Sequence, residues 1–114
     1  MNNIDKANLS QRRVVEFLKD HNFILSEVKS PTTNGIDIVA IKDSKNISVE
    51  VKSVIRSSRS WKVRKPNIKS DYIAVVMPSG TIHFESMSDW LSLCSKDGSR
   101  SITKLVNLYE LIDL

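Results

Sequence analysis

Cysteine is nearly absent from this chain of 114 residues, in which Cys94 is the only one. A single cysteine excludes an intramolecular disulfide and argues against a zinc site built on thiolates. No apolar run comes near the roughly 20 residues that span a bilayer. The first ten residues, MNNIDKANLS, lack the apolar segment of a signal peptide. These absences predict a cytoplasmic protein without membrane contact.

Several enzyme signatures are missing as well. The sequence contains no pattern typical of a Ser–His–Asp triad, a P-loop or a dinucleotide-binding turn, so we expect no small-molecule cofactor. Internal repeats and low-complexity linkers are also absent. With an apolar fraction of 40% and a charged fraction of 26%, residues 1–114 suit one domain with one hydrophobic core.

Acidic residues are missing from one stretch of the chain. Residues 56–69, RSSRSWKVRKPNIK, carry six basic residues and no acidic one, in a chain of net charge +4. Such a concentration of one sign predicts a polyanionic partner, although a solvated loop is an alternative. Its cations could neutralise phosphates without reading sequence, and its tryptophan could stack on an unpaired base or anchor the loop in the core. The candidate nucleic-acid-binding residues are Arg56, Arg59, Trp61, Lys62, Arg64, Lys65 and Lys69.

Apolar periodicity predicts a helix, a small sheet and further helices. Helical spacing of apolar residues covers residues 4–20 and again the tail 101–114. Between them lies a short helix that begins with Ser86 and Asp89 as a capping box. Alternating apolar segments bounded by turn residues predict strands over 23–29, 36–42, 46–53, 71–77 and 80–85. The fold class is therefore α/β or α+β, with the N-terminal helix on a small mixed sheet and C-terminal helices packed back on it.

Two acids and a lysine interrupt the hairpin formed by the second and third of these strands. Side chains alternate across a strand, so Ser48, Glu50 and Lys52 share one face while the apolar residues share the other. With an even number of loop residues, Asp37 falls opposite Lys52 and one diagonal step from Glu50. An odd number would mix apolar and charged residues on both faces, which register specificity disfavours. The pattern predicts two carboxylates and an ammonium within about 5–8 Å of one another.

This group of charges has the composition of a metal site. Two close carboxylates repel each other and need a counter-charge, which a divalent cation supplies through carboxylate oxygens. Val49 or Val51 can add a main-chain carbonyl from the same strand. Lys52 can then orient a water molecule or stabilise charge on a phosphate. The alternative is an ion-pair cluster on an exposed sheet face.

The segment GID, followed by twelve residues and then EVK, resembles the PD-(D/E)XK nucleases, and most of all the small Holliday-junction resolvases. The resemblance extends over residues 4–85. It implies a restriction-endonuclease-like αβββαβ core. It also implies that Asp37 and Glu50 bind Mg²⁺, for which we expect Mn²⁺ to substitute, and Val51 is our candidate for the main-chain ligand. Lys52 would assist the water that attacks a phosphodiester bond.

The sequence departs from that family in three places. Many members carry an acid on the first helix, but here Glu16 lies far around the helix and Gln11 occupies the apolar face, where resolvase-like relatives have glutamate. Gln11 could hold a metal-bound water or a DNA phosphate. Ile36 stands where the motif has proline. No helix is legible in residues 54–71, which read as an extended arm or a short strand.

The sequence therefore predicts a metal-dependent endonuclease that acts on DNA. Because 114 residues offer limited surface for gripping a duplex, we expect a homodimer. Two alternatives remain open. The first is a non-catalytic nucleic-acid-binding protein of the same fold, which the glutamine at position 11 would suit. The second is a toxin-like ribonuclease that uses the same acidic patch.

Overall fold

A computed structural model of the chain describes residues 3–29, 37–57, 60–63, 66, 69–78, 80–96 and 98–102. The helices and strands follow one another as α1 (Asn3–Asp20), β1 (Ile24–Val28), β2 (Ile38–Lys42), β3 (Lys45–Ser53), β4 (Ile55–Ser57), β5 (Ser60–Val63), β6 (Tyr72–Val76), β7 (Ile82–Ser86), α2 (Met87–Ser92) and β8 (Arg100–Ile102). This mixed α/β architecture with an N-terminal helix is the predicted fold class.

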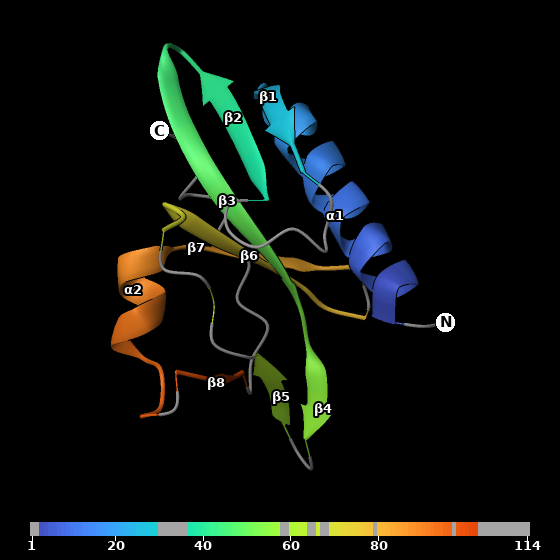
Figure 1. Ribbon diagram of the computed structural model, residues 1–114, viewed down its shortest axis with the longest axis vertical. Coiled ribbons are helices and arrows are strands. Elements are labelled where there is room, and N and C mark those ends of the chain that lie inside the picture. The colour runs from blue at the N-terminus through green and yellow to red at the C-terminus, as the bar shows by residue number, and fades with distance from the viewer. Residues whose placement is uncertain are drawn as a thin grey trace.

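The main sheet has five strands in the order β1-β2-β3-β6-β7. All neighbouring pairs are antiparallel except β3 and β6, which run parallel. Helix α1 lies along one face of this sheet (Figure 1). Parallel neighbours need a long crossover, usually a helix. Within the described residues the crossover here holds the strands β4 and β5 instead, so these parts of the basic stretch are extended, in agreement with the predicted extended arm or short strand.

A smaller sheet has the order β4-β5-β8. Figure 1 shows β3 running on toward β4, with β5 beside β4 and β8 on the far side of β5. Helix α1 is tied to this junction because Ser10 Oγ lies 2.7 Å from Ser53 Oγ, and Lys6 Nζ donates to the Val54 carbonyl at 2.9 Å. The final helix predicted over 101–114 is wrong at its start, where Arg100–Ile102 form a strand, and residues 103–114 lie outside the described part of the chain.

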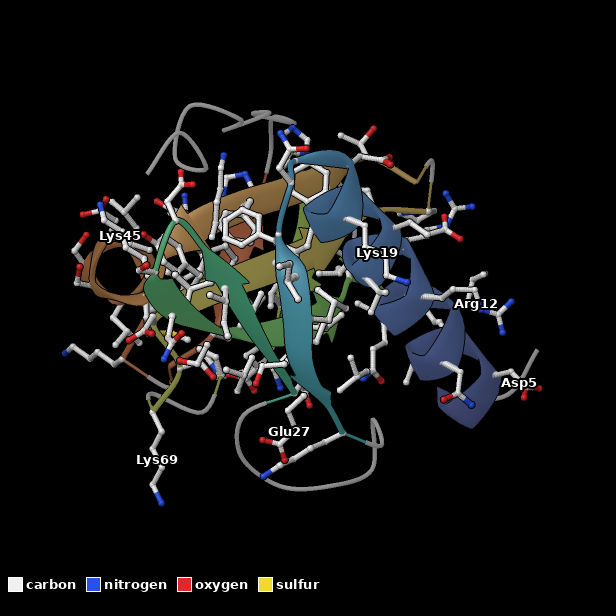
Figure 2. The ribbon with its side chains drawn as sticks, turned by 90° about the horizontal axis from the view of Figure 1, so that it is seen from above. Asp5, Arg12, Lys19, Glu27, Lys45 and Lys69 are labelled. Carbon is white, nitrogen blue, oxygen red and sulfur yellow. The ribbon has the colours of Figure 1, made fainter. Side chains whose placement is uncertain are left out.

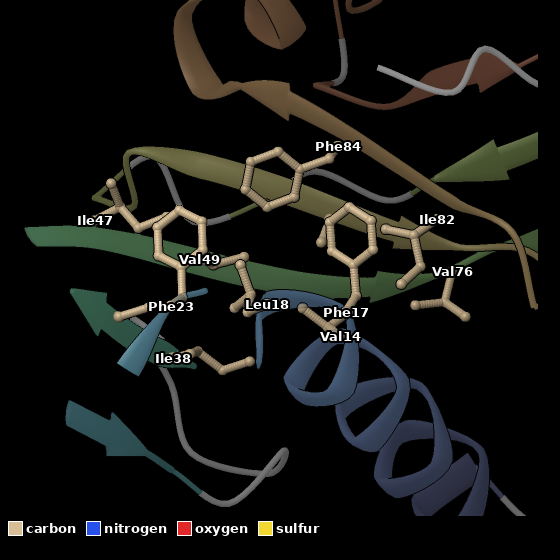
Figure 3. Packing of buried hydrophobic residues seen from close by; sticks show 12 residues of the cluster. Val14, Phe17, Leu18, Phe23, Ile38, Ile47, Val49, Val76, Ile82 and Phe84 are labelled. Carbon is tan, nitrogen blue, oxygen red and sulfur yellow. The ribbon is translucent and has the colours of Figure 1, made fainter. Parts of the chain in front are cut away.

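The main sheet has one cluster of buried apolar residues on each of its two faces. On one face, Val14, Phe17 and Leu18 of α1 pack against strand residues such as Val49 and Phe84 (Figure 3). On the other face, residues of β6 pack with α2 and with the base of the small sheet. This second cluster consists of Val54, Val63, Ile73, Val75, Met77, Met87 and Trp90. The one predicted core is thus two clusters separated by the sheet.

The turn between β2 and β3 sets the register of the hairpin. Asp43 and Ser44 form a two-residue loop with φ of 50° and 68°, and Lys42 pairs with Lys45. Two consecutive positive φ values are typical of a turn that matches the twist of antiparallel strands. The predicted even parity is confirmed. The predicted pairing, which set Asp37 opposite Lys52, is wrong by two residues. The centre of the loop lies one residue earlier in the chain than that pairing requires, and each such step changes the partner by two residues.

Among the described residues, no helix is both long enough and apolar enough to cross a membrane.

Candidate functional site

The two candidate metal-binding acids face each other across the hairpin. Ile38 pairs with Val49, so extending the ladder by one residue places Asp37 opposite Glu50 rather than opposite the predicted Lys52. Both acids are buried, with exposed fractions of 8% for Asp37 and 6% for Glu50. Glu50 pairs with Ile73, a residue of the cluster on the α2 side. The acids therefore lie on the face of the sheet opposite α1.

The carboxylate of Asp37 takes part in the main-chain bonding of the sheet. Asp37 immediately precedes β2, and its Oδ2 accepts a hydrogen bond from the Val51 N–H at 2.8 Å. Burial raises the pKa of Asp37 above its ordinary value of 3.8, while the Val51 N–H and the Lys52 charge act in the opposite direction. A buried carboxylate whose charge is incompletely compensated is a suitable ligand for a cation.

The raised pKa predicts how stability depends on pH without added metal. Because the folded state holds the Asp37 proton more tightly than the unfolded state, folding stability should fall as pH rises from 3.8 through the folded-state pKa. The Asp37→Asn variant should lack this component, so the difference in unfolding free energy between variant and wild type should grow over that interval. Urea denaturation at a series of pH values in EDTA measures it. A constant difference would contradict the assigned direction.

Lys52 completes the group of charges from the same strand. Its Nζ lies 3.6 Å from Glu50 Oε1, and its side chain is 27% exposed, against 8% for that of Glu50. The ammonium therefore sits at the solvent side of the buried carboxylates. An ammonium in this position can contact a phosphate or a water that approaches the two acids from solvent.

Gln11 is buried against the sheet, whereas Glu16 is exposed. Its Nε2 donates to the Lys29 carbonyl at 2.5 Å, and the Lys29 N–H donates to the Asp37 carbonyl at 2.8 Å. Gln11 thus connects α1 to the backbone that precedes the site. The acids lie on the opposite face of the sheet from α1, and the predicted role of Gln11 at the metal site stays a prediction.

The donor set of the site suits a hard, well-hydrated cation. Within the described part of the chain, no group of three or more His, Cys, Asp or Glu side chains could hold a metal. Mg²⁺ is usually bound through one or two carboxylates and keeps several waters, so Asp37 and Glu50 are sufficient anionic ligands. The main-chain carbonyl of Val51 belongs to a residue whose N–H already faces Asp37. These three residues could hold the ion.

The basic stretch is described only in part. Arg56 lies in β4, and Trp61 and Lys62 lie in β5, where Arg56 pairs with Trp61. Lys62 is half-buried and Lys69 is exposed, with its side chain pointing away from the protein in Figure 2. The side chains of Arg56 and Trp61, and the whole of Arg59, Arg64 and Lys65, lie outside the described residues. Their predicted contacts with nucleic acid stay predictions.

A second group of ionisable residues, His83, Glu85 and Arg100, was not predicted from the sequence. His83 Nε2 and Arg100 Nη1 lie 2.9 and 2.6 Å from the same oxygen, Oε2 of Glu85. Alternation along β7 could have placed His83 and Glu85 on one face. Nothing in the sequence links Arg100 to them, because the three short strands that bring it there have no distinctive pattern.

Comparisons with known proteins support the fold. No family model matches the chain, and no curated protein matches it. Among solved structures, it is similar to the bacterial homing endonuclease I-Ssp6803I, with a TM-score of 0.71 and 11% sequence identity. The match covers 90% of this chain and 76% of that one. The chain thus has a nuclease-like fold.

Proposed function

We propose that this protein is a Mg²⁺-dependent endonuclease of the PD-(D/E)XK type that hydrolyses phosphodiester bonds in DNA. One observation carries the proposal: Asp37, Glu50 and Lys52 lie together on one face of a nuclease-like sheet, at the pairing of β2 with β3. The similarity to a homing endonuclease adds support for DNA as the substrate class.

The residues of the site divide the chemistry between them. Asp37 and Glu50 would hold the cation, and the bond from the Val51 N–H keeps the Asp37 carboxylate oriented. The bound ion would polarise the scissile phosphate and lower the pKa of a coordinated water. Lys52, at the solvent side, would orient the attacking water and stabilise the charge that develops on the phosphate. The basic residues of the β4–β5 region would bind flanking phosphates.

The assembly proposed is a cytoplasmic homodimer. A chain of 114 residues can contact only a short length of duplex, and two copies would bring two sites to the two strands. Sedimentation of the free protein and of its DNA complex tests this part of the proposal.

The deciding experiment is a cleavage panel. Supercoiled plasmid, linear duplex, single strands, four-way junctions and tRNA are incubated with Mg²⁺, Mn²⁺, Ca²⁺ or EDTA. We expect cleavage of at least one DNA with Mg²⁺ or Mn²⁺ and none with EDTA. Cleavage of tRNA alone would replace this proposal by the ribonuclease alternative.

Replacing Lys52 by methionine should separate binding from catalysis. Methionine keeps much of the length of the side chain and removes its charge, so cleavage should fall by about a hundredfold, a typical loss for one transition-state contact. Mn²⁺ binding, measured by electron paramagnetic resonance, should persist because both carboxylates remain. Cleavage within threefold of wild type would exclude the assigned role of Lys52.

A non-catalytic nucleic-acid-binding protein is the second candidate. The observation that favours it concerns Gln11, whose side-chain amide donates a hydrogen bond to the Lys29 carbonyl. Many PD-(D/E)XK nucleases carry an acid at the position that Gln11 occupies here. This candidate predicts DNA binding that weakens with salt, is independent of Mg²⁺ and is accompanied by no cleavage anywhere in the panel.

A further inference from the structure

A buried ionic cluster joins the main sheet to the small sheet. Glu85 of β7 is 7% exposed, and its Oε2 is shared between Arg100 Nη1 of β8 at 2.6 Å and His83 Nε2 at 2.9 Å. Hydrogen bonds between a guanidinium and a carboxylate are short and directional, and they strengthen when the carboxylate is shielded from water. The Arg100–Glu85 bond is thus a strong link between the two sheets.

Trp90 constrains the same guanidinium from a second direction. Arg100 Cζ lies 4.4 Å from the centre of the Trp90 ring, which is fully buried in α2. A planar guanidinium can bond a carboxylate through its edge while it packs its face on an aromatic ring, which an ammonium does not reproduce. Glu85 and Trp90 together therefore determine both the position and the orientation of Arg100.

The cluster lies on the same face of the main sheet as the candidate site. Glu50 pairs with Ile73, and Ile73 pairs with Glu85, so the three form one row across β3, β6 and β7. Arg100 in turn pairs with Val63 at the end of β5. The described residues thus form a continuous path from Glu50 to the strand that carries Lys62.

The small sheet is attached to the main sheet by apolar packing at its base, where Val54 and Val63 are buried, and by polar links at its two sides. A small sheet needs a hydrophobic face or packing against a helix to be stable. On the β4 side, the small sheet is anchored where Val54 is buried and Lys6 donates to the Val54 carbonyl. On the β8 side, the described polar anchor to the main sheet is Arg100. Without the Arg100–Glu85 bond, the β8 side would be held by apolar packing alone, which is not directional and leaves the angle of the small sheet less restricted.

We propose that Arg100 is a positioning residue for nucleic acid: through Glu85 and Trp90 it holds the small sheet at a fixed distance from Asp37 and Glu50. The inference rests on the proposed function, since it assigns the small sheet to phosphate binding beside that site. A surface held in its binding geometry loses less conformational entropy on association than a mobile one.

Two variants test the proposal by nucleic-acid binding in EDTA. Glu85→Gln is nearly isosteric and removes a negative charge, so electrostatics alone predicts equal or tighter binding of a polyanion. Arg100→Lys keeps the charge but loses the planar fork. We expect both to weaken binding of a DNA duplex by about tenfold, the cost of ordering one or two additional groups. Asp89→Asn is the matched control, because it removes an exposed carboxylate beside Trp90 and should not weaken binding.

The distance between the main sheet and the small sheet can be measured without DNA. Spin labels at positions 44 and 60, in a Cys94→Ser background, report the distance between the β2–β3 turn and the start of β5. We expect one narrow distance distribution in the parent protein and a clearly broader one in both variants, with Mn²⁺ binding unchanged in all three. Thermal unfolding confirms that each variant folds.

Broader distributions together with weaker DNA binding would support the proposal. Unchanged distance distributions in both variants would overturn it, and so would unchanged or tighter DNA binding. If the parent protein bound none of the nucleic acids, the proposed function would fall. The distance distributions would still decide whether Arg100 fixes the small sheet.

Discussion

Replacing Asp37 by asparagine is expected to abolish metal-dependent cleavage while leaving the protein folded and at least as stable as wild type. The amide can still accept the Val51 N–H, so the main-chain bond at 2.8 Å has a replacement acceptor. The variant loses one of two anionic ligands for the cation. Because a catalytic metal contributes several kcal/mol to the transition state, the rate should fall by at least about a hundredfold.

Stability is expected to change in the opposite direction from activity. Asp37 is buried opposite Glu50, and its burial raises its pKa, so neutralising the side chain relieves an unfavourable charge in the metal-free protein. Chemical denaturation in EDTA should show an unfolding free energy equal to or higher than that of wild type. Adding Mg²⁺ should stabilise wild type and not the variant.

The control for this experiment is Asp43→Asn. Asp43 is also an aspartate of the hairpin, but it is exposed in the turn, where its φ of 50° suits asparagine. Cleavage by Asp43→Asn should stay within about twofold of wild type, since surface substitutions away from a site have small effects. Full Mg²⁺-dependent cleavage by Asp37→Asn, or by the corresponding Glu50→Gln variant, would falsify the proposed mechanism.

Replacing Phe84 by alanine is expected to produce the largest loss of stability. Phe84 is 1% exposed and belongs to the cluster beneath α1 (Figure 3). Its ring centre is 6.0 Å from that of Phe17 and 5.1 Å from that of Tyr72. Truncating a buried phenylalanine costs about 3–5 kcal/mol through lost burial and the remaining cavity. Domains have only about 5–15 kcal/mol of stability, so the variant should be mostly unfolded on modest heating.

Urea denaturation followed by circular dichroism measures this loss. Leu93→Ala is the matched control: Leu93 is a large apolar residue but is 61% exposed, so its truncation should change the unfolding free energy by less than about 0.5 kcal/mol. Equal effects of the two substitutions would show that Phe84 is not a core residue.

The pairing of the acids shows how far local pattern can predict a site. Alternation placed Glu50 and Lys52 on one face, and the requirement that apolar faces match selected an even loop. The choice between Asp37 opposite Lys52 and Asp37 opposite Glu50 depended on which two residues form the turn. Both registers bury the same apolar residues on the same face, so hydrophobic pattern cannot distinguish them.

What the sequence determined by itself was therefore everything that depends on neighbours along the chain. Periods of 3.6 and 2 residues set the α1 helix, the strands of the main sheet and the face on which each acid lies. Tertiary structure alone decided which residues from distant segments meet, as Glu85 meets Arg100 and Gln11 meets Lys29. Those contacts depend on how strands and helices pack in three dimensions, which no local repeat of the sequence encodes.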